Sequence, residues 1–185
     1  DDVIIFNKGC DILNGEEGGD TYLTSFQGGN AQTLAIVLDT GGPSDVDVLS
    51  VTGTMLADQI LLRANNDGSE SFVANINQNS NVERINYNFT IERIVVNGHF
   101  GDDHFAVDDT VAEVTLNGDE GEDTFQIGQL FRSQRTAADA NISVTPYDDE
   151  FATIETTRGF LSNGISEAMV ANGGLGNDIF VVYHN

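Results

Sequence analysis

Basic residues, cysteine, tryptophan and long apolar runs are all scarce in this chain of 185 residues. Seven Lys plus Arg against 30 Asp plus Glu give a formal net charge of −23, which argues against binding of nucleic acid, because the nucleic-acid backbone is also negative. The single cysteine, Cys10, excludes an intramolecular disulfide; we expect a buried, inert thiol, with a link to another chain as the alternative. No apolar stretch approaches the length of a membrane span.

Signatures of catalysis are missing as well. The sequence contains neither a G-x-S-x-G nucleophile elbow nor an H-E-x-x-H zinc motif, and it has no tryptophan for an aromatic sugar-binding groove. His99 and His104 flank the pair Asp102–Asp103, which leaves a transition-metal site or a glycosidase-like carboxylate pair as alternatives to plain turn surface. We expect turn surface at these residues, and we expect no enzymatic activity.

Apolar residues are sufficient for a folded core despite the charge. They make up 39% of the chain, and 11 Phe with 4 Tyr argue against disorder. The abundance of Gly, Asn, Thr and Val favours strands and turns over helices. Short apolar or alternating runs, each bounded by turn residues, predict strands within residues 3–6, 34–38, 46–51, 60–62, 72–76, 82–96, 111–116 and 169–170.

The most informative feature is a nine-residue frame that recurs along the chain. Residues 173–181 read Gly-Gly-Leu-Gly-Asn-Asp-Ile-Phe-Val, with Gly at positions one and four, Asp at position six and a large apolar residue at position eight. Copies that keep these positions begin at Gly15, Gly98 and Gly118, and a decayed copy begins at Gly53. The four intact copies are each preceded by an asparagine: Asn14, Asn97, Asn117 and Asn172.

Each conserved position of the frame has a physical purpose. Glycine allows the positive φ of a tight turn. The aspartate offers a carboxylate to calcium, which takes about six to eight oxygen ligands, and the apolar residue opens a strand. One turn cannot fill that coordination sphere, so turns must stack and share the ion. Ten of the 30 acidic residues lie in the four intact copies, which favours bound cations over a merely solvated acidic surface.

The intervals between copies predict how the turns stack. Gly98 and Gly118 are 20 residues apart, about one coil of a stack, so we expect these two turns to lie one above the other and to hold the strongest ion site. Intervals of 38, 45 and 55 residues separate the other neighbouring copies, Gly15 from Gly53, Gly53 from Gly98 and Gly118 from Gly173. These longer intervals predict coils that have lost the frame, or insertions.

One irregular insertion is predicted within residues 132–166. This segment fills the longest interval and carries three of the seven basic side chains, Arg132, Arg135 and Arg158. It is the best place to look for a function other than calcium binding, and a plain surface loop is the simpler interpretation. The chain otherwise reads as one unit over 1–185. It opens with Asp1-Asp2, shows no signal peptide and looks like a segment of a longer repetitive protein.

The frame resembles the calcium-binding repeat of RTX (haemolysin-type) proteins, and the chain is similar to a segment of a large secreted bacterial protein of that kind. The resemblance implies an all-β, parallel β-solenoid (a β-roll or β-helix) with calcium in its Gly/Asp-rich turns, located outside the cell or on its surface. It also implies metal ligands at the matched positions: the side chains of Asp20, Asp103, Asp123 and Asp178, and the carbonyls of Gly15, Gly18, Gly98, Gly101, Gly118, Gly121, Gly173 and Gly176.

Several functions fit such a segment. We expect a calcium-stabilised structural or adhesive element, as in an adhesin or a biofilm matrix protein. One alternative is a self-assembling subunit of an extracellular filament or matrix, with neighbouring copies or further repeats as partners. Another is a β-helix enzyme acting on polysaccharide, although seven basic residues are few for a groove that binds an acidic sugar. The alternative fold is an ordinary β domain in which Asn-Gly turns end hairpins.

Overall fold

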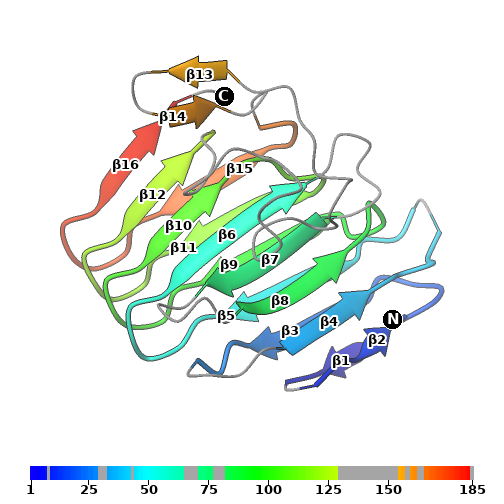
Figure 1. Ribbon diagram of the computed structural model, residues 1–185. Helices are drawn as coiled ribbons and strands as arrows, with labels where there is room; N and C mark the ends of the chain where they lie inside the picture. Colours follow the sequence, from blue (N-terminus) through cyan, green and yellow to red (C-terminus); the bar gives the residue numbers. More distant parts are fainter. Residues whose placement is uncertain are drawn as a thin grey trace.

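The computed structural model describes residues 1–7, 9–28, 33–42, 44–64, 71–76, 82–128, 154–156, 159–161 and 165–183. Within these ranges the chain is all-β, as predicted, and no helix is present that could cross a membrane. The described strands are shown in Figure 1: β1 (Val3–Ile5), β2 (Ile12–Leu13), β3 (Thr21–Ser25), β4 (Thr33–Val37), β5 (Val48–Thr52), β6 (Gln59–Ala64), β7 (Ser71–Ile76), β8 (Val82–Tyr87), β9 (Arg93–Asn97), β10 (His104–Val107), β11 (Glu113–Asn117), β12 (Thr124–Ile127), β13 (Ile154–Thr156), β14 (Gly159–Leu161), β15 (Met169–Asn172) and β16 (Ile179–Val182).

The chain alternates between two sheets, and this alternation determines where its turns lie. Sheet A has the order β1-β3-β5-β9-β11-β15, and all of its neighbouring strands are parallel. Sheet B has the order β16-β12-β10-β6-β7-β8-β4-β2. We call the turns that lead from sheet A to sheet B the A-to-B turns, and those that return the B-to-A turns. Turns of one kind therefore lie beside one another along one edge of the two sheets (Figure 1).

The larger of two hydrophobic clusters among the described residues fills the space between the sheets. In β9 and β11 alternate residues are buried, so Ile94, Val96, Val114 and Leu116 point inward and the residues between them point outward, as the two-residue period of a strand requires. The position-eight residues of three frames stack as a column in sheet B. The Phe105 and Phe125 rings are parallel with centroids 4.8 Å apart, and those of Phe125 and Phe180 are 4.7 Å apart.

An antiparallel excursion interrupts sheet B. Strand β6 pairs with β7 and β7 pairs with β8, both antiparallel, so three strands stand where other coils have one. This excursion accounts for the 45-residue interval between Gly53 and Gly98. Side chains on the outward face of β6 and β7 take part in a second buried cluster. Arg63, also in β6, donates from Nε to Asp108 Oδ2 at 3.0 Å, and both side chains are fully buried.

The 55-residue interval also corresponds to one coil. Strand β11 pairs with β15 and β12 pairs with β16, so the additional residues lie between β12 and β15. Of the predicted insertion 132–166, the described parts are 165–166 and the strands β13 and β14, which pair antiparallel. The remainder, including the three arginines named above, lies outside the described residues.

Cys10 differs from the prediction. It is a free, exposed thiol in the A-to-B turn between β1 and β2, so the expectation of a buried thiol is wrong. The reason is its place at the rim of the molecule: β1 and β2 are the edge strands of their sheets, and the nearby Ile5 and Ile12 are also exposed.

Candidate metal sites

Four frames stack in one row along the A-to-B edge. The copies that begin at Gly53, Gly98, Gly118 and Gly173 each connect a strand of sheet A to a strand of sheet B, and their flanking strands are neighbours in that order. We call residues 53–58, 98–103, 118–123 and 173–178 the A-to-B row. The prediction that the Gly98 and Gly118 turns are stacked is confirmed. The Gly53 and Gly98 turns, and the Gly118 and Gly173 turns, are also one coil apart, so these two longer intervals contain insertions rather than coils that have lost the frame.

The copy at Gly15 lies on the opposite edge. It connects β2 to β3 and is therefore a B-to-A turn, which separates Asp20 from the aspartates of the A-to-B row. Its backbone nevertheless matches the other intact copies: φ is +68° at Glu16 and +111° at Gly18, against +81° at His99 and +109° at Gly101. The frame therefore encodes a local turn conformation that fits either edge.

The two glycines of the frame serve different needs. The glycine at position four has a positive φ of 109–150° in the four intact copies, as expected. The glycines at position one do not have a positive φ. There, a Cβ would lie closer than 3.0 Å to Oδ2 of the position-six aspartate, a separation that real Cβ atoms essentially never show. Position one is thus glycine because the carboxylate packs directly on its Cα.

The position-six aspartates form a ladder along the A-to-B row. The backbone N–H of Asp58 donates to Asp103 Oδ1 at 2.8 Å, that of Asp103 to Asp123 Oδ1 at 2.8 Å, and that of Asp123 to Asp178 Oδ1 at 3.0 Å. Each carboxylate therefore uses one oxygen to hold the preceding turn. The second oxygen remains for another ligand.

The asparagines before the frames form a second ladder. Asn117 Nδ2 donates to Asn97 Oδ1, and Asn172 Nδ2 donates to Asn117 Oδ1, both at 2.8 Å. Their main chains also connect the turns: the Gly98 N–H donates to the Asn117 carbonyl at 2.7 Å. The repeated asparagine is thus explained by contacts between coils. Asn14, on the other edge, bonds Thr40 instead.

Two aspartates of the row have buried carboxylate oxygens without a donor. Asp103 and Asp123 are 1% and 0% exposed, and Oδ2 of each has no hydrogen-bond partner. Asp103 Oδ2 and the carbonyl oxygen of Gly118 both crowd the same face of Gly98, and Asp123 Oδ2 meets the next turn in the same way. Burial, together with the carboxylates of Asp58 and Asp123, raises the pKa of Asp103 to about 8; burial also raises the pKa of Asp123. A buried charge without a partner is costly, and a cation would remove that cost.

Asp58 in the decayed copy is surrounded by donors instead. Its Oδ2 accepts the Thr54 N–H at 2.6 Å, and its Oδ1 accepts the Thr54 hydroxyl at 3.0 Å and the Asn75 amide at 2.7 Å. Asn75 belongs to β7, the additional strand of sheet B. The carboxylate of Asp58 is therefore satisfied by the protein itself.

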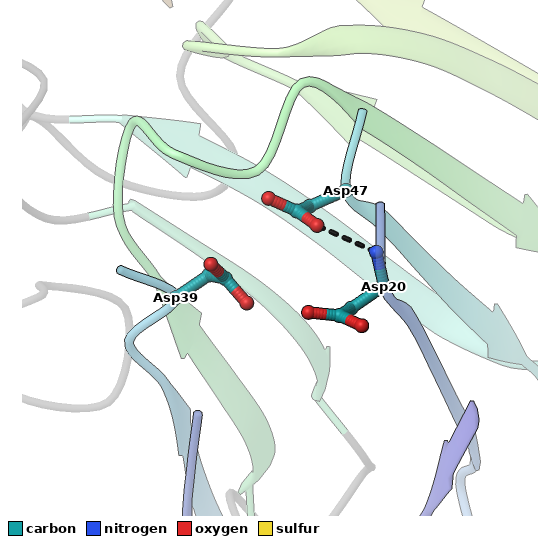
Figure 2. A group of neighbouring side chains, drawn as sticks. All are labelled: Asp20, Asp39 and Asp47. Atoms are coloured by element: carbon teal, nitrogen blue, oxygen red, sulfur yellow. Dashed lines mark hydrogen bonds between the residues drawn. The ribbon is translucent and has the colours of Figure 1, made fainter. Parts of the chain in front are cut away.

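A compact carboxylate cluster lies on the B-to-A edge. Asp20, Asp39 and Asp47 are at most 1% exposed, and one oxygen from each lies within 4.8 Å of the others (Figure 2). Asp20 precedes β3, Asp39 follows β4 and Asp47 precedes β5. Among the described residues this is the one group of three metal-binding side chains. His99 and His104 belong to no such group there.

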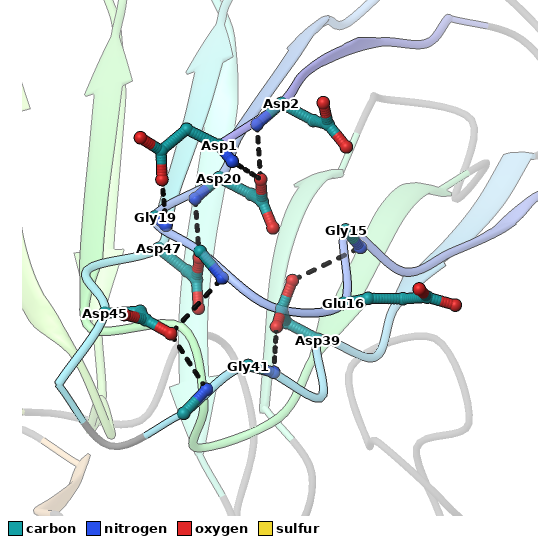
Figure 3. Close-up of polar contacts among 12 residues, drawn as sticks. Asp1, Asp2, Gly15, Glu16, Gly19, Asp20, Asp39, Gly41, Asp45 and Asp47 are labelled. Carbon is teal, nitrogen blue, oxygen red and sulfur yellow. Dashed lines mark hydrogen bonds and ion pairs between the residues drawn. The ribbon is translucent and has the colours of Figure 1, made fainter.

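Hydrogen bonds from backbone N–H groups hold this edge together (Figure 3). The Asp20 N–H donates to Asp47 Oδ1 at 2.7 Å, the Gly41 N–H to Asp39 Oδ1 at 2.6 Å, and the Gly18 N–H to Asp45 Oδ2 at 3.2 Å. The three carboxylates thus face one another from fixed backbones. Burial raises the pKa of Asp47, and the nearby negative charges of Asp39, Glu92 and Asp20 raise it further.

The sequence prediction missed Asp39 and Asp47. A signal for Asp47 exists, because Gly42, Asp47 and Leu49 occupy positions one, six and eight of a frame that lacks the second glycine. No pattern marks Asp39, which follows a strand rather than ending a turn.

Searches against family models, curated proteins and solved structures find no match. The geometry and chemistry of the two edges therefore carry the functional interpretation.

Proposed function

We propose that this chain is a calcium-stabilised structural or adhesive segment of an extracellular RTX-type protein, folded as a parallel β-solenoid. The alternation between sheets A and B, the parallel registers and the shared turn conformation support the solenoid. One observation carries the calcium role: Oδ2 of Asp103 and of Asp123 is buried without a donor, beside a carbonyl oxygen of the next turn.

Calcium suits these groups better than other common metals. It accepts about six to eight carboxylate, carbonyl and water oxygens in a flexible geometry, whereas magnesium requires a near-ideal octahedron and zinc favours nitrogen and sulfur. Because the three intact turns of the row share one backbone conformation, we place the ions between successive intact turns. The proposed ligands are the carboxylates of Asp103, Asp123 and Asp178 and carbonyls of Gly98, Gly101, Gly118, Gly121, Gly173 and Gly176.

The net charge of the chain relates calcium binding to folding outside the cell. A net charge of −23 opposes the compact state through self-repulsion, and bound cations reduce this repulsion. Weak sites with millimolar dissociation constants are typical of extracellular modules. Such a segment is loosely folded where calcium is low, inside the cell, and becomes fully folded after export.

The exposed ends of the stack favour a second candidate, assembly with further coils. Phe180 stacks on Phe125 with one face but is 48% exposed, and Ile5 in β1 is 72% exposed. Both lie on edge strands, whose free backbone groups can pair with another strand. Light scattering in calcium tests this: concentration-dependent growth that Phe180→Asp abolishes supports assembly, and a constant monomer contradicts it.

Thermal melting of the whole chain tests the calcium role. We compare chelator, calcium and magnesium at one ionic strength, with titration calorimetry for the stoichiometry. A site at a hundredfold excess of calcium over its dissociation constant stabilises the fold by about 2.7 kcal/mol. A midpoint that does not move, or one that rises equally with magnesium, contradicts the proposal.

A further inference from the structure

We propose a second, separate cation site on the B-to-A edge, in which the carboxylates of Asp20, Asp39 and Asp47 and the backbone carbonyl of Glu16 bind one calcium ion. Two of these aspartates, Asp39 and Asp47, lie outside every intact frame. The site shares no residue with the A-to-B row, so either one can exist without the other.

The carboxylate of Asp20 keeps one buried oxygen without a hydrogen-bond partner. Its Oδ1 accepts the Asp2 N–H, and the amino group of Asp1 lies 3.9 Å from the same oxygen. Its Oδ2 is buried and has no hydrogen-bond partner. This oxygen packs on Gly15, whose N–H is 3.3 Å from Asp39 Oδ2, and Figure 2 shows the carboxylate turned toward the cluster.

Three oxygen atoms converge beside Gly41. A Cβ built on this glycine would be 3.0 Å from Asp39 Oδ1, 3.0 Å from the Glu16 carbonyl oxygen and 3.3 Å from Asp47 Oδ2. Three oxygens from two connecting segments, β2–β3 and β4–β5, thus gather beside one glycine, with no basic side chain among them. Figure 3 shows these segments meeting at the edge.

The donor set selects a hard divalent cation. Three carboxylates and a carbonyl supply only oxygen, without the nitrogen or sulfur that zinc favours, and water can complete a shell of about six to eight ligands. The site brings three formal negative charges to one point, whereas each position in the row offers fewer carboxylates and relies on carbonyls. Since ligand charge raises calcium affinity, the B-to-A site fills first.

Terbium luminescence of the intact chain tests this site. Terbium replaces calcium at oxygen sites and emits when a nearby aromatic ring absorbs light. The chain has no tryptophan, and the buried hydroxyl of Tyr22 donates to Asp39 Oδ2, which places an antenna in direct contact with the cluster. We expect tyrosine-excited emission that calcium displaces more readily than magnesium, and that falls severalfold in Tyr22→Phe while calorimetry still detects calcium binding.

Charge-matched variants decide where the ion lies. The double variant Asp39→Asn/Asp47→Asn should weaken terbium binding at least tenfold, whereas Glu17→Gln, an exposed change in the same turn, and Asp103→Asn/Asp123→Asn should leave it unchanged. Emission that survives the first variant, or falls equally in the row variant, overturns the proposal. If the double variant does not fold by circular dichroism, the single variant Asp47→Asn is used with the same criterion. Failure here leaves the calcium-dependent melting assigned to the row untouched, so the two proposals fail separately.

Discussion

Asp58 and Asp103 hold the same position in adjacent turns of the A-to-B row, yet their carboxylates have opposite surroundings. Asp58 accepts hydrogen bonds from Thr54 and Asn75. Asp103 has one oxygen with no donor and packs beside the carbonyl of Gly118. The two residues nevertheless belong to the same ladder, because the Asp58 N–H donates to Asp103 Oδ1. The ladder between turns is shared, and the surroundings of the carboxylates are not.

This difference separates two functions of one frame. The first glycine and the ladder are common to every turn of the A-to-B row, whether or not an ion binds. The ion requires a carboxylate oxygen that the protein leaves unsatisfied. In the Gly53 copy the donors come from a threonine at position two and from the additional strand β7. The antiparallel excursion therefore supplies part of what we propose calcium supplies in the intact turns. The four predictions below test this separation, beginning with the largest expected effect.

Glycine substitutions should affect both kinds of turn alike. Gly53→Ala and Gly118→Ala each place a Cβ closer than 3.0 Å to a carbonyl oxygen of the next turn and to the local aspartate. We expect a loss of about 3 kcal/mol or more for each, with or without calcium, measured by urea unfolding. Gly42→Ala is the control, because its Cβ would approach nothing closer than 3.2 Å. A small loss for Gly53→Ala alone would show that the decayed turn is not stacked like the others.

Aspartate substitutions should separate the two turns. In calcium, Asp103→Asn should lose about 2.7 kcal/mol, the stabilisation from a site at a hundredfold excess of ion. In chelator it should gain about 1–3 kcal/mol, because a buried carboxylate without a donor is removed. Asp58→Asn should lower the free energy of unfolding by the same amount in calcium and in chelator, since it weakens hydrogen bonds that do not involve an ion. Urea unfolding in the two buffers measures this, and Asp102→Asn, an exposed neighbour, is the control. Parallel behaviour of Asp58 and Asp103 would refute the comparison.

Sequence reasoning reached the parts of the molecule that depend on local pattern. The alternating apolar residues gave the strand positions, and the 20-residue interval between Gly98 and Gly118 gave their stacking. The sequence did not predict features that depend on which strand or turn becomes the neighbour. Apolar runs at 60–62 and 72–76 carry no signal that β6 and β7 pair antiparallel, and the Gly15 frame carries no signal for its edge, because the turn conformation is the same on both. Asp39 was unreachable, since only the fold brings it to Asp20.

The pH dependence of stability should depend on Asp103. Its folded pKa of about 8 exceeds the unfolded value of about 3.9, so between these values the folded state binds the extra proton and stability falls as pH rises. In chelator, one pH unit in this window should cost at most about 1.4 kcal/mol for this group. Asp103→Asn should flatten the dependence, and Asp58→Asn should not. With calcium the dependence should flatten toward zero, because the ion binds the deprotonated carboxylate and neither the folded nor the unfolded state then holds a proton there between pH 6 and pH 7. Unfolding at pH 6 and pH 7 in both buffers measures these slopes; a chelator slope of the opposite sign would contradict the assignment.

The smallest expected effect concerns the asparagine ladder. Asn117 donates to Asn97 and accepts from Asn172, whereas the decayed copy has Thr52 at the equivalent position. Asn117→Thr gives an intact turn the residue of the decayed one and removes two hydrogen bonds at a partly exposed site. Because each such bond contributes about 0.5–1.5 kcal/mol, and water replaces part of it, we expect a loss of about 1 kcal/mol in total. The loss should be equal in calcium and in chelator, since the ladder belongs to the turn rather than to the ion. A loss confined to calcium would place Asn117 in the coordination shell and would merge the two functions that the Asp58 and Asp103 turns otherwise separate.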